Sequence, residues 1–562
     1  MNRFRILLLS STRPWRAWRI AERISSEIPD AEICGVVQHA VRQLPRTQRL
    51  IAAGRIDRIG LRDHVLALAS LWSRKVLGEL VHLVLWCAHG CPRGIHAKGN
   101  FTVIELAQRC RRDGRPFLHA DHCSDQNVAD FVRRQNPDLV IVLGQPSLGR
   151  VLLEVPANGL VRVMTNRTTE TLQQGIELKV EHFARGSESP CTLVSLTLPS
   201  QTHSGALGVT LKNDLIADDL LVQVAKSSGE GSQTQASKEV REWAQRMLSP
   251  YLNQFELPSQ HFPAAPERIT FRRRYRSVVK LCVQSLLGFP WVMGRNWYRR
   301  LRGRYPVLIL THHLVSDRPH PMGIPTEEFW LRIRFLQRHY RIVSLSEAAA
   351  LLRSGRVSVP TVVLTFDDGY CDNFISLRAV AEEMGAPVAL FIATQPVETH
   401  QEFDHDLSVE TRGFFPLTWG QIRYWSVRGA EFGSHTRTHF DCGAARRSGL
   451  EQELVGSKSD LEVRLGRRAT FFAFPFGKHE NISSEAMQIA ASTYSIFLSS
   501  FGGENLPQKG TGRQHLLRKG FYSDPWELEL EIQSVFDLVQ RSKLRLKRPL
   551  SGWRPDPATA KS

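Results

Sequence analysis

Two aspartates, Asp367 and Asp368, follow an apolar run in the string VVLTFDDGY, directly before Gly369. Adjacent ionised carboxylates repel one another, and each raises the pKa of the other. The apolar run predicts a buried strand, and α/β folds bind ligands beyond the carboxyl ends of such strands. A cation or a proton between the carboxylates would explain the pair, and a turn or helix N-cap is the alternative.

Two histidines, His435 and His439, lie four residues apart in GSHTRTHF. We expect a helical turn here, which would place both imidazoles on one face, where they could bind a single ion. Together with one carboxylate they would leave coordination positions open, as catalytic metal sites do. A pair of surface histidines without a shared role is the alternative.

Two more apolar runs end in residues that could contribute to a site. LTHH ends at His313, and FFAFPFG contains Pro475 and Phe476. Each run alone fits an ordinary strand followed by a turn, and a satisfied core histidine would explain LTHH. The alternation of strand-like and helix-like segments after Tyr305 predicts an α/β domain.

Together these motifs resemble the polysaccharide deacetylase family, also called the NodB-homology family or carbohydrate esterase family 4, over about residues 305–530. TFDDGYCDNF is similar to the first catalytic motif of the family. LTWGQIRYWSVRGAEFGSHTRTH is similar to the second motif and its approach, and FFAFPFGKH to the third. The resemblance implies a distorted (β/α) barrel and removal of N-acetyl groups from amino sugars.

The resemblance also implies roles for single residues. Asp368, His435 and His439 would hold a divalent metal, most often zinc, and Asp367 would be the general base toward a water molecule. The backbone N–H of Phe476 would stabilise the oxyanion, at a position where the family usually has tyrosine.

The remaining site residues implied by the resemblance are less well defined by their motifs. His313, Trp419 and Pro475 would contact substrate, and Arg518, which matches an arginine of a related subgroup, would be a catalytic residue. His515 lies off register from the late histidine that serves many members as the general acid. The proton donor to the leaving amine is therefore unassigned.

The N-terminal half alternates helix and strand patterns, which predicts a Rossmann-like parallel sheet. NVADFVRRQNPDLVIVLGQ and SGALGVTLKNDLIADDLLVQ are similar to segments of formyltransferases, with ALGVTLKND expected as a strand. Active members carry Asn-x-His, where this chain has Arg162 and Met164; Asn166 and Asp218 are displaced. Because Met164 cannot exchange a proton, we expect a domain kept for binding or positioning.

Composition shifts divide the chain. We expect a formyltransferase-like α/β domain over 1–226, a linker with a basic amphipathic segment over 227–304, a deacetylase domain over 305–545 and a tail over 546–562. The net charge is +18, and residues 271–304 contain ten basic residues and no acidic one. With Trp291, Trp297 and Tyr298, this segment predicts contact with an anionic membrane surface; a basic linker helix is the alternative. Nucleic acid is not expected, because no recognition fold accompanies the charge.

Nine scattered cysteines and the absence of a long apolar run predict a cytoplasmic protein, peripheral to the inner face of the membrane if the basic segment binds lipid. Cys87, His89, Cys91 and the string HADHC could suggest a second metal site, but their spacing is irregular.

We expect a metal-dependent hydrolase that deacetylates an acetylated amino sugar or glycan, with a cytoplasmic or membrane-surface intermediate as substrate. A bifunctional sugar formyltransferase and deacetylase, or a noncatalytic glycan-binding scaffold, are the alternatives.

Overall fold

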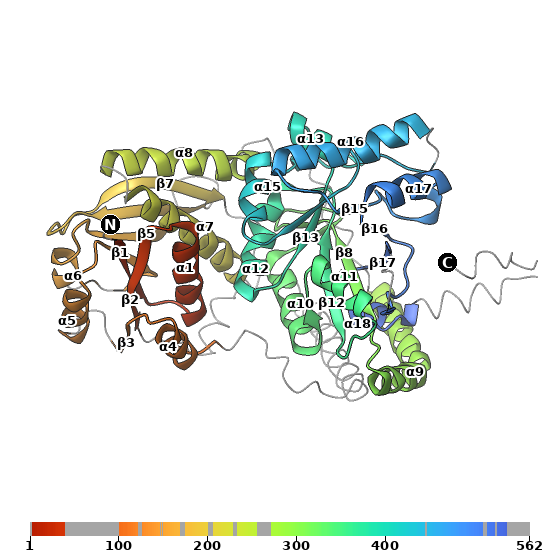
Figure 1. Cartoon of the computed structure of the whole chain (residues 1–562), viewed down its shortest axis with the longest axis horizontal. Helices are drawn as coiled ribbons and strands as arrows, with labels where there is room; N and C mark the ends of the chain where they lie inside the picture. Colours follow the sequence, from red (N-terminus) through yellow and green to blue (C-terminus); the bar gives the residue numbers. More distant parts are fainter. Residues whose placement is uncertain are drawn as a thin grey trace, which may run out of the picture.

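The computed structural model of the chain consists of two α/β halves that lie side by side (Figure 1). It describes residues 3–39, 101–121, 126–146, 148, 150–168, 175–199, 206–228, 233–255, 271–443, 447–509, 514–522 and 525–536.

The N-terminal half is built on a seven-stranded sheet with the order β3-β2-β1-β4-β5-β6-β7. Pairing is parallel from β3 to β5 and antiparallel from β5 to β7. The strands are β1 (Phe4–Ser10), β2 (Ala31–His39), β3 (Phe117–Ala120), β4 (Leu139–Leu143), β5 (Leu160–Thr168), β6 (Gly175–Phe183) and β7 (Cys191–Pro199). The helices are α1 (Pro14–Glu27), α4 (Val103–Arg112), α5 (Gln126–Gln135), α6 (Arg150–Glu154), α7 (Ala206–Ser228) and α8 (Gln233–Leu252). The predicted Rossmann-like α/β class is confirmed.

Strand β1 shows why its sequence is a continuous apolar run. Ile6 and Leu8 pack in the core that contains α1, α4 and α7, whereas Leu7 and Leu9 pack in the core that contains α5 and α6. Because helices cover both faces of the sheet, the side chains that point to either face are buried.

The expected strand over ALGVTLKND is wrong, because these residues open the long helix α7. Helix α7 contacts strands β5 and β6 on one side and α10 and α12 of the C-terminal half on the other. A helix buried between two layers is apolar on several sides, so its sequence lacks the one-sided period of a surface helix.

The segment 227–304, expected to be a linker, is largely helical in its described part. Helix α8 buries Val240, Trp243 and Leu248 in the core shared by both halves. Helix α9 (Phe271–Arg302) then runs up to the first strand of the barrel. In the described ranges no helix is both long and apolar enough to cross a bilayer.

The C-terminal half is a closed barrel of seven parallel strands, because β12 pairs with both β8 and β13. The ring consists of β8 (Val307–His312), β12 (Thr361–Phe366), β13 (Ala389–Ile392), β14 (Glu431–Ser434), β15 (Phe471–Ala473), β16 (Ile496–Ser499) and β17 (His515–Gly520). Since all of these strands are parallel, their carboxyl ends meet at one end of the barrel. The predicted (β/α) barrel is confirmed.

Further elements surround this ring. The short strands are β9 (Leu314–Val315), β10 (Gly323–Ile324) and β11 (Arg341–Ile342), the last beside β12. The helices are α10 (Thr326–His339), α11 (Leu345–Ser354), α12 (Ser376–Met384), α13 (Thr394–Thr399), α14 (Asp404–Leu407), α15 (Trp419–Ser426), α16 (Arg447–Leu465), α17 (Ser484–Thr493) and α18 (Pro525–Ile532).

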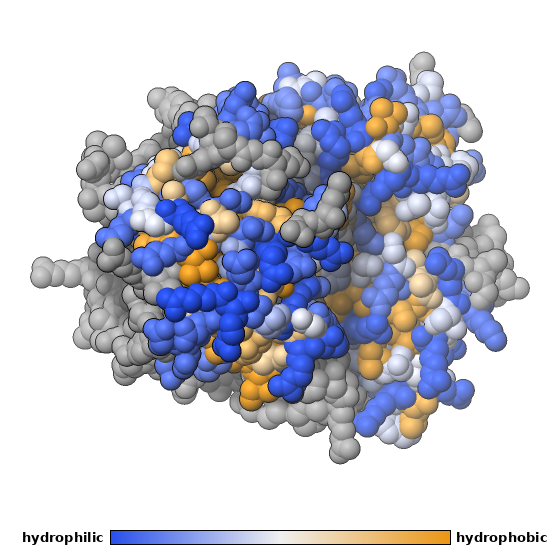
Figure 2. Space-filling view, turned by 60° about the vertical axis from the view of Figure 1, so that its left-hand side comes forward, coloured by the Kyte–Doolittle hydropathy of each residue, from blue (hydrophilic) through white to orange (hydrophobic). Residues whose placement is uncertain are grey.

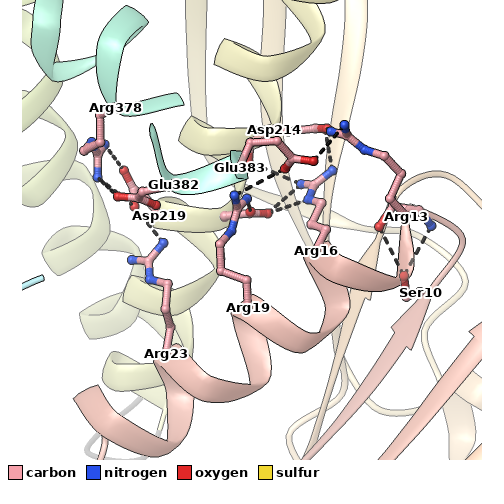
Figure 3. A network of polar contacts seen from close by, with 12 residues as sticks. Ser10, Arg13, Arg16, Arg19, Arg23, Asp214, Asp219, Arg378, Glu382 and Glu383 are labelled. Atoms are coloured by element: carbon pink, nitrogen blue, oxygen red, sulfur yellow. Dashed lines mark hydrogen bonds and ion pairs between the residues drawn. The ribbon is translucent and has the colours of Figure 1, made fainter. Parts of the chain in front are cut away.

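A buried ion-pair network joins the two halves (Figure 3). Asp219 on α7 pairs with Arg378 on α12 and with Arg23 on α1, and accepts a hydrogen bond from Tyr424 Oη at 2.8 Å. Asp218 pairs with Arg16 and Arg19 on α1. Burial alone would raise the pKa of Asp219, but the surrounding guanidinium groups outweigh it and lower the pKa.

A cavity of about 1020 Å³ opens beside this network, lined by α1, α8 and α15. Figure 2 shows hydrophilic side chains over much of the visible face, with hydrophobic side chains in scattered groups between them. This pattern is ordinary for the surface of a globular protein.

Candidate active site

The residues singled out from the sequence follow strands of the barrel on the same end. Asp367 and Asp368 come directly after β12, His435 directly after β14, and Phe476 shortly after β15. Arg518 lies near the end of β17, whose Gly520 is level with Thr311 of β8. The closed parallel ring therefore gathers side chains that are far apart in sequence, since Arg518 is separated from Asp367 by 151 positions.

Asp368, His435 and His439 form a cluster with the donor set of a metal site. One ligand atom of each residue lies within 4.8 Å of the other two. His439 Nε2 is 3.2 Å and His435 Nε2 is 3.5 Å from Asp368 Oδ1. The structure brings the three predicted ligands together, and their role as ligands stays a prediction.

Asp368 has the geometry of a carboxylate that could bind a cation. Its residue exposure is 0%, its φ is +68°, and within the described ranges neither carboxylate oxygen has a hydrogen-bond partner. A buried charge without a hydrogen bond is costly unless positive charge lies beside it. Burial would raise the pKa of Asp368, but the neighbouring histidines outweigh it and hold the pKa well below its usual range. A divalent metal fits this position.

His435 is oriented by the backbone. Its Nδ1 lies 2.8 Å from the carbonyl oxygen of Ala473, so Nδ1 carries the proton and Nε2 presents its lone pair toward Asp368. Burial is the main cause that lowers the pKa of His435 to about 4, so the imidazole is neutral at physiological pH. Metal-binding histidines are commonly oriented by a carbonyl acceptor in this way.

The expected helical turn at His435 and His439 is wrong. The segment after Ser434 is an irregular loop in which Thr436 and His439 have φ of +63° and +59°. Glu453 on α16 fixes the loop by accepting hydrogen bonds from the N–H groups of Arg437 and Thr438 at 2.8 and 2.9 Å. The two imidazoles converge because of this loop, and not through helical spacing.

Asp367 is paired differently from its neighbour. Arg518 Nη1 donates to Asp367 Oδ1 at 2.6 Å, and Thr311 Oγ1 donates to Asp367 Oδ2 at 3.3 Å. Burial would raise the pKa of Asp367, but the charge of Arg518 leads the opposing causes and the pKa is lowered. The adjacent carboxylates are thus separated in role: Asp367 faces a fixed guanidinium, whereas Asp368 faces two imidazoles.

Comparison with known proteins agrees with this geometry. Residues 354–494, which include Asp367, Asp368, His435 and His439, match the family model "Polysaccharide deacetylase". The C-terminal region contains a polysaccharide deacetylase domain. The match supports a carbohydrate deacetylase acting on glycans.

Individual relatives are distant. YxkH of Bacillus subtilis (strain 168), whose name assigns it to the polysaccharide deacetylases, is 23% identical over 213 residues, which cover 37% of this chain and 70% of that protein. The deacetylase PplD of Streptococcus pyogenes is 20% identical, covering 41% of this chain and 98% of its own, with a TM-score of 0.34. Glycinamide ribonucleotide transformylase 1 of Symbiobacterium toebii is 11% identical, covering 41% and 89%, with a TM-score of 0.26. The strand order of each half, and not these two low TM-scores, establishes its fold.

Phe476 and Pro475 lie at the mouth of the candidate site. Phe476 has φ of +60°, is 49% exposed, and its ring centroid is 4.9 Å from that of His439. Within the described ranges its N–H donates no hydrogen bond, so it is free for a ligand. Pro475 is buried, and its carbonyl oxygen accepts from the N–H of Gly477 at 2.6 Å.

His313 directly follows β8, whose His312 is paired with Phe366 of β12, so it lies level with Asp367 at the carboxyl end of the barrel. Its carbonyl oxygen accepts a hydrogen bond from Asn373 Nδ2 at 2.9 Å. A role of His313 in substrate binding stays a prediction that its position allows.

The expected substrate contact by Trp419 is not supported by its position. Trp419 opens α15 and is 8% exposed in the shared core. Its Nε1 donates to Glu398 at 2.8 Å, and the guanidinium of Arg464 lies 5.6 Å from the ring centroid. Thr418 of the LTW string caps the start of α15, and Trp419 is the first residue of this helix. The indole therefore lies between α13 and α16.

His515 is three residues before Arg518 on β17. Its Nε2 lies 2.7 Å from Ser499 Oγ, and its ring stacks on Phe497 with a centroid distance of 5.0 Å. His515 is therefore nearer the amino end of β17 than Arg518, and so farther from the end of the barrel where Arg518 pairs with Asp367.

Sequence reasoning missed His405, which lies at the edge of the site on α14. Its Nε2 is 3.7 Å from Asp368 Oδ2 and 2.9 Å from Tyr370 Oη. Since Tyr370 donates its O–H to Asp406 at 2.9 Å, His405 Nε2 is the donor to Tyr370. No repeated pattern marks this segment, so no signal in the sequence could have identified it.

Two of the N-terminal residues compared with the catalytic motif of formyltransferases have structural partners in this chain. Arg162 on β5 donates to Glu181 at 2.8 Å, and Asp218 is neutralised by arginines of α1. Met164 and Asn166 also lie on β5. Cys87, His89, Cys91 and the last two residues of HADHC, which could suggest a second metal site, lie outside the described residues, as does the tail 546–562.

Proposed function

We propose that this chain is a divalent-metal-dependent N-deacetylase that hydrolyses the acetamide of an acetylated amino sugar in a glycan. The observation that carries the proposal is the cluster around Asp368, whose buried carboxylate has no hydrogen-bond partner among the described residues and faces His435 and His439. An open site with these donors beside an ionised Asp367 suits hydrolysis of an unreactive amide.

Asp368, His435 and His439 would hold the metal, and their oxygen and nitrogen donors suit zinc. Such a metal, when bound, acts as a Lewis acid and makes water more acidic. Asp367 stays ionised beside Arg518, so its Oδ2 would accept the proton of the attacking water. The Phe476 N–H would donate to the carbonyl oxygen as negative charge develops there.

The substrate that we propose is a cytoplasmic or membrane-surface glycan intermediate. Five described cysteines are free, and four of them are buried, which agrees with a reducing compartment.

Acetate release from oligomers of N-acetylglucosamine and N-acetylgalactosamine tests the proposal, with O-acetylated glycans as a separate arm. We expect acetate and an equal amount of free amine from an N-acetylated oligomer, and loss of both when a chelator removes the metal. Release from O-acetylated glycans alone, or no release after zinc is supplied, would contradict it.

A further inference from the structure

Helix α9 carries a row of exposed apolar side chains. Leu286 and Leu287 are each 75% exposed, and Leu301 is 65% exposed. The full row consists of Val283, Leu286, Leu287, Trp291, Met293, Trp297, Tyr298 and Leu301. Exposed helix positions of globular proteins are normally polar, so this face differs from an ordinary surface helix.

The opposite face of α9 fixes the helix to the barrel. Leu281, Val292 and Asn296 are buried, and Asn296 Nδ2 donates to Gln533 Oε1 at 3.0 Å. A Cβ on Gly288 would come within 2.9 Å of Val535. With 3.6 residues per turn, the buried positions lie about half a turn from positions 283, 287, 294 and 301. The apolar row is therefore turned outward by a packed interface.

Basic residues border the apolar row on both sides. Lys280, Arg300, Arg302 and Arg304 are exposed, and segment 271–304 contains no acidic residue. The guanidinium of Arg295 lies 4.3 Å from the ring centroid of Trp291, and that of Arg302 lies 5.5 Å from that of Tyr298. Aromatic rings and arginines in this order are typical of helices at the boundary between lipid headgroups and acyl chains.

We propose that α9 docks the protein on an anionic lipid bilayer. The row would lie in the headgroup–acyl boundary along about 27 Å of helix, at 1.5 Å per residue from Val283 to Leu301, while the bordering cations meet lipid phosphates. A bilayer matches both features of this face at once: a long apolar strip and exposed cations near both of its ends.

The position of α9 also sets the orientation of the docked enzyme. Asn296 and Arg299 line a small cavity with Pro306 and Thr361, which lie where β8 and β12 begin. The candidate site lies at the opposite, carboxyl end of these strands, and Figure 1 shows α9 near the lower end of the barrel. The docked site would thus face away from the bilayer and take its glycan from the aqueous side. Docking does not depend on the proposed catalytic activity.

Flotation of the full chain with vesicles tests the proposal. Mixed phosphatidylglycerol and phosphatidylcholine vesicles are compared with vesicles of phosphatidylcholine alone. We expect wild-type protein to float with the anionic vesicles. Leu286→Asp/Leu287→Asp should lower the partition coefficient at least about a hundredfold, since two exposed leucines lose their burial. Arg300→Ala/Arg302→Ala should lower it about 30-fold at low salt.

Matched controls lie on α16 and directly after it, away from this helix. Val463→Asp removes a 78% exposed apolar side chain, and Arg467→Ala/Arg468→Ala removes two exposed cations; both should float like the wild type. Wild-type protein that stays with the soluble fraction, or that binds both vesicle types equally, would overturn the proposal. A wild-type dimer that Leu286→Asp/Leu287→Asp converts to a monomer, without vesicle binding, would assign the row to a second copy instead.

Discussion

Arg518 donates a hydrogen bond of 2.6 Å from Nη1 to Oδ1 of Asp367, and both side chains are almost fully buried. This pair explains how two adjacent aspartates can coexist at the end of β12. The guanidinium neutralises Asp367, so Asp368 alone needs the cation that the two histidines could share. In the proposed mechanism, Arg518 is a positioning residue that keeps the general base ionised.

Replacing Arg518 should shift the pH dependence of the reaction. Burial would raise the pKa of Asp367, but Arg518 leads the causes that lower it, so in Arg518→Met the pKa should rise. Because Asp367 acts when ionised, the acid limb of kcat/KM for acetate release should move to higher pH by the same amount. Arg518→Lys, which keeps the charge, should move it less. An unchanged acid limb in Arg518→Met would show that the pair does not set this ionisation.

The backbone at Phe476, and not its ring, should matter for the chemical step. Its φ of +60° is a conformation that glycine adopts readily. Phe476→Gly retains the N–H and should keep kcat within about threefold, while the loss of the exposed ring raises KM. Replacing Phe476 by its α-hydroxy acid analogue turns the peptide N–H into an ester oxygen, leaves φ free and should lower kcat about a hundredfold or more. Circular dichroism of both variants checks that the barrel is intact, and equal kcat values would contradict a donor role.

The motifs at the strand ends could be predicted from the sequence because each is a continuous stretch of residues that follows a single strand. Asp367, Asp368 and His435 needed only the topology of a parallel barrel to meet, whereas His439 also needs the irregular loop that follows β14. His405 was not accessible, because its position depends on the contacts that His405 and Asp406 of α14 make with Tyr370 across the chain.

Two predictions differ from the structure for the same physical reason, which is that tertiary packing decided where the residues lie. The apolar string of α7 resembled a strand because the helix is buried between two layers. Trp419 resembled a site residue because it precedes the histidine motif, whereas the side chain completes the core at the capped start of α15. Local patterns do not report which of several buried environments an apolar residue enters.

The two halves should depend on Asp219 for their stability. Asp219→Asn leaves Arg23 and Arg378 buried without its charge, which should lower the free energy of unfolding by about 3–5 kcal/mol. Urea denaturation followed by tryptophan fluorescence measures the change. Asp130→Asn, at a carboxylate that is 49% exposed on α5, is the control and should change it by less than about 0.5 kcal/mol. Equal effects of the two variants would contradict a structural role of the network.

Glu529 should make stability depend on pH. This buried carboxyl group accepts a hydrogen bond from Tyr340 Oη at 3.0 Å, and burial raises its pKa from 4.5 to about 7. Between these values the folded state binds more protons than the unfolded state, so the free energy of unfolding contributed by Glu529 falls as pH rises.

Glu529→Gln does not titrate, so its stability relative to wild type should increase by up to about 3 kcal/mol as pH rises through that window. Thermal denaturation at a series of pH values measures the difference. Glu328→Gln, at an exposed position of α10, should show no such trend. A constant difference for Glu529→Gln would mean that Glu529 is ionised in the folded protein throughout.

The most direct test of the proposed mechanism measures metal content and acetate release together, in the wild type, Asp367→Asn and Asp368→Asn. We predict about one divalent metal per chain in the wild type and in Asp367→Asn, and loss of the metal in Asp368→Asn. We also predict acetate release from an N-acetylated glycan by the wild type and a decrease of about a hundredfold or more in Asp367→Asn. A wild-type chain that binds no metal and releases no acetate, or an Asp367→Asn variant with full activity, would contradict the mechanism.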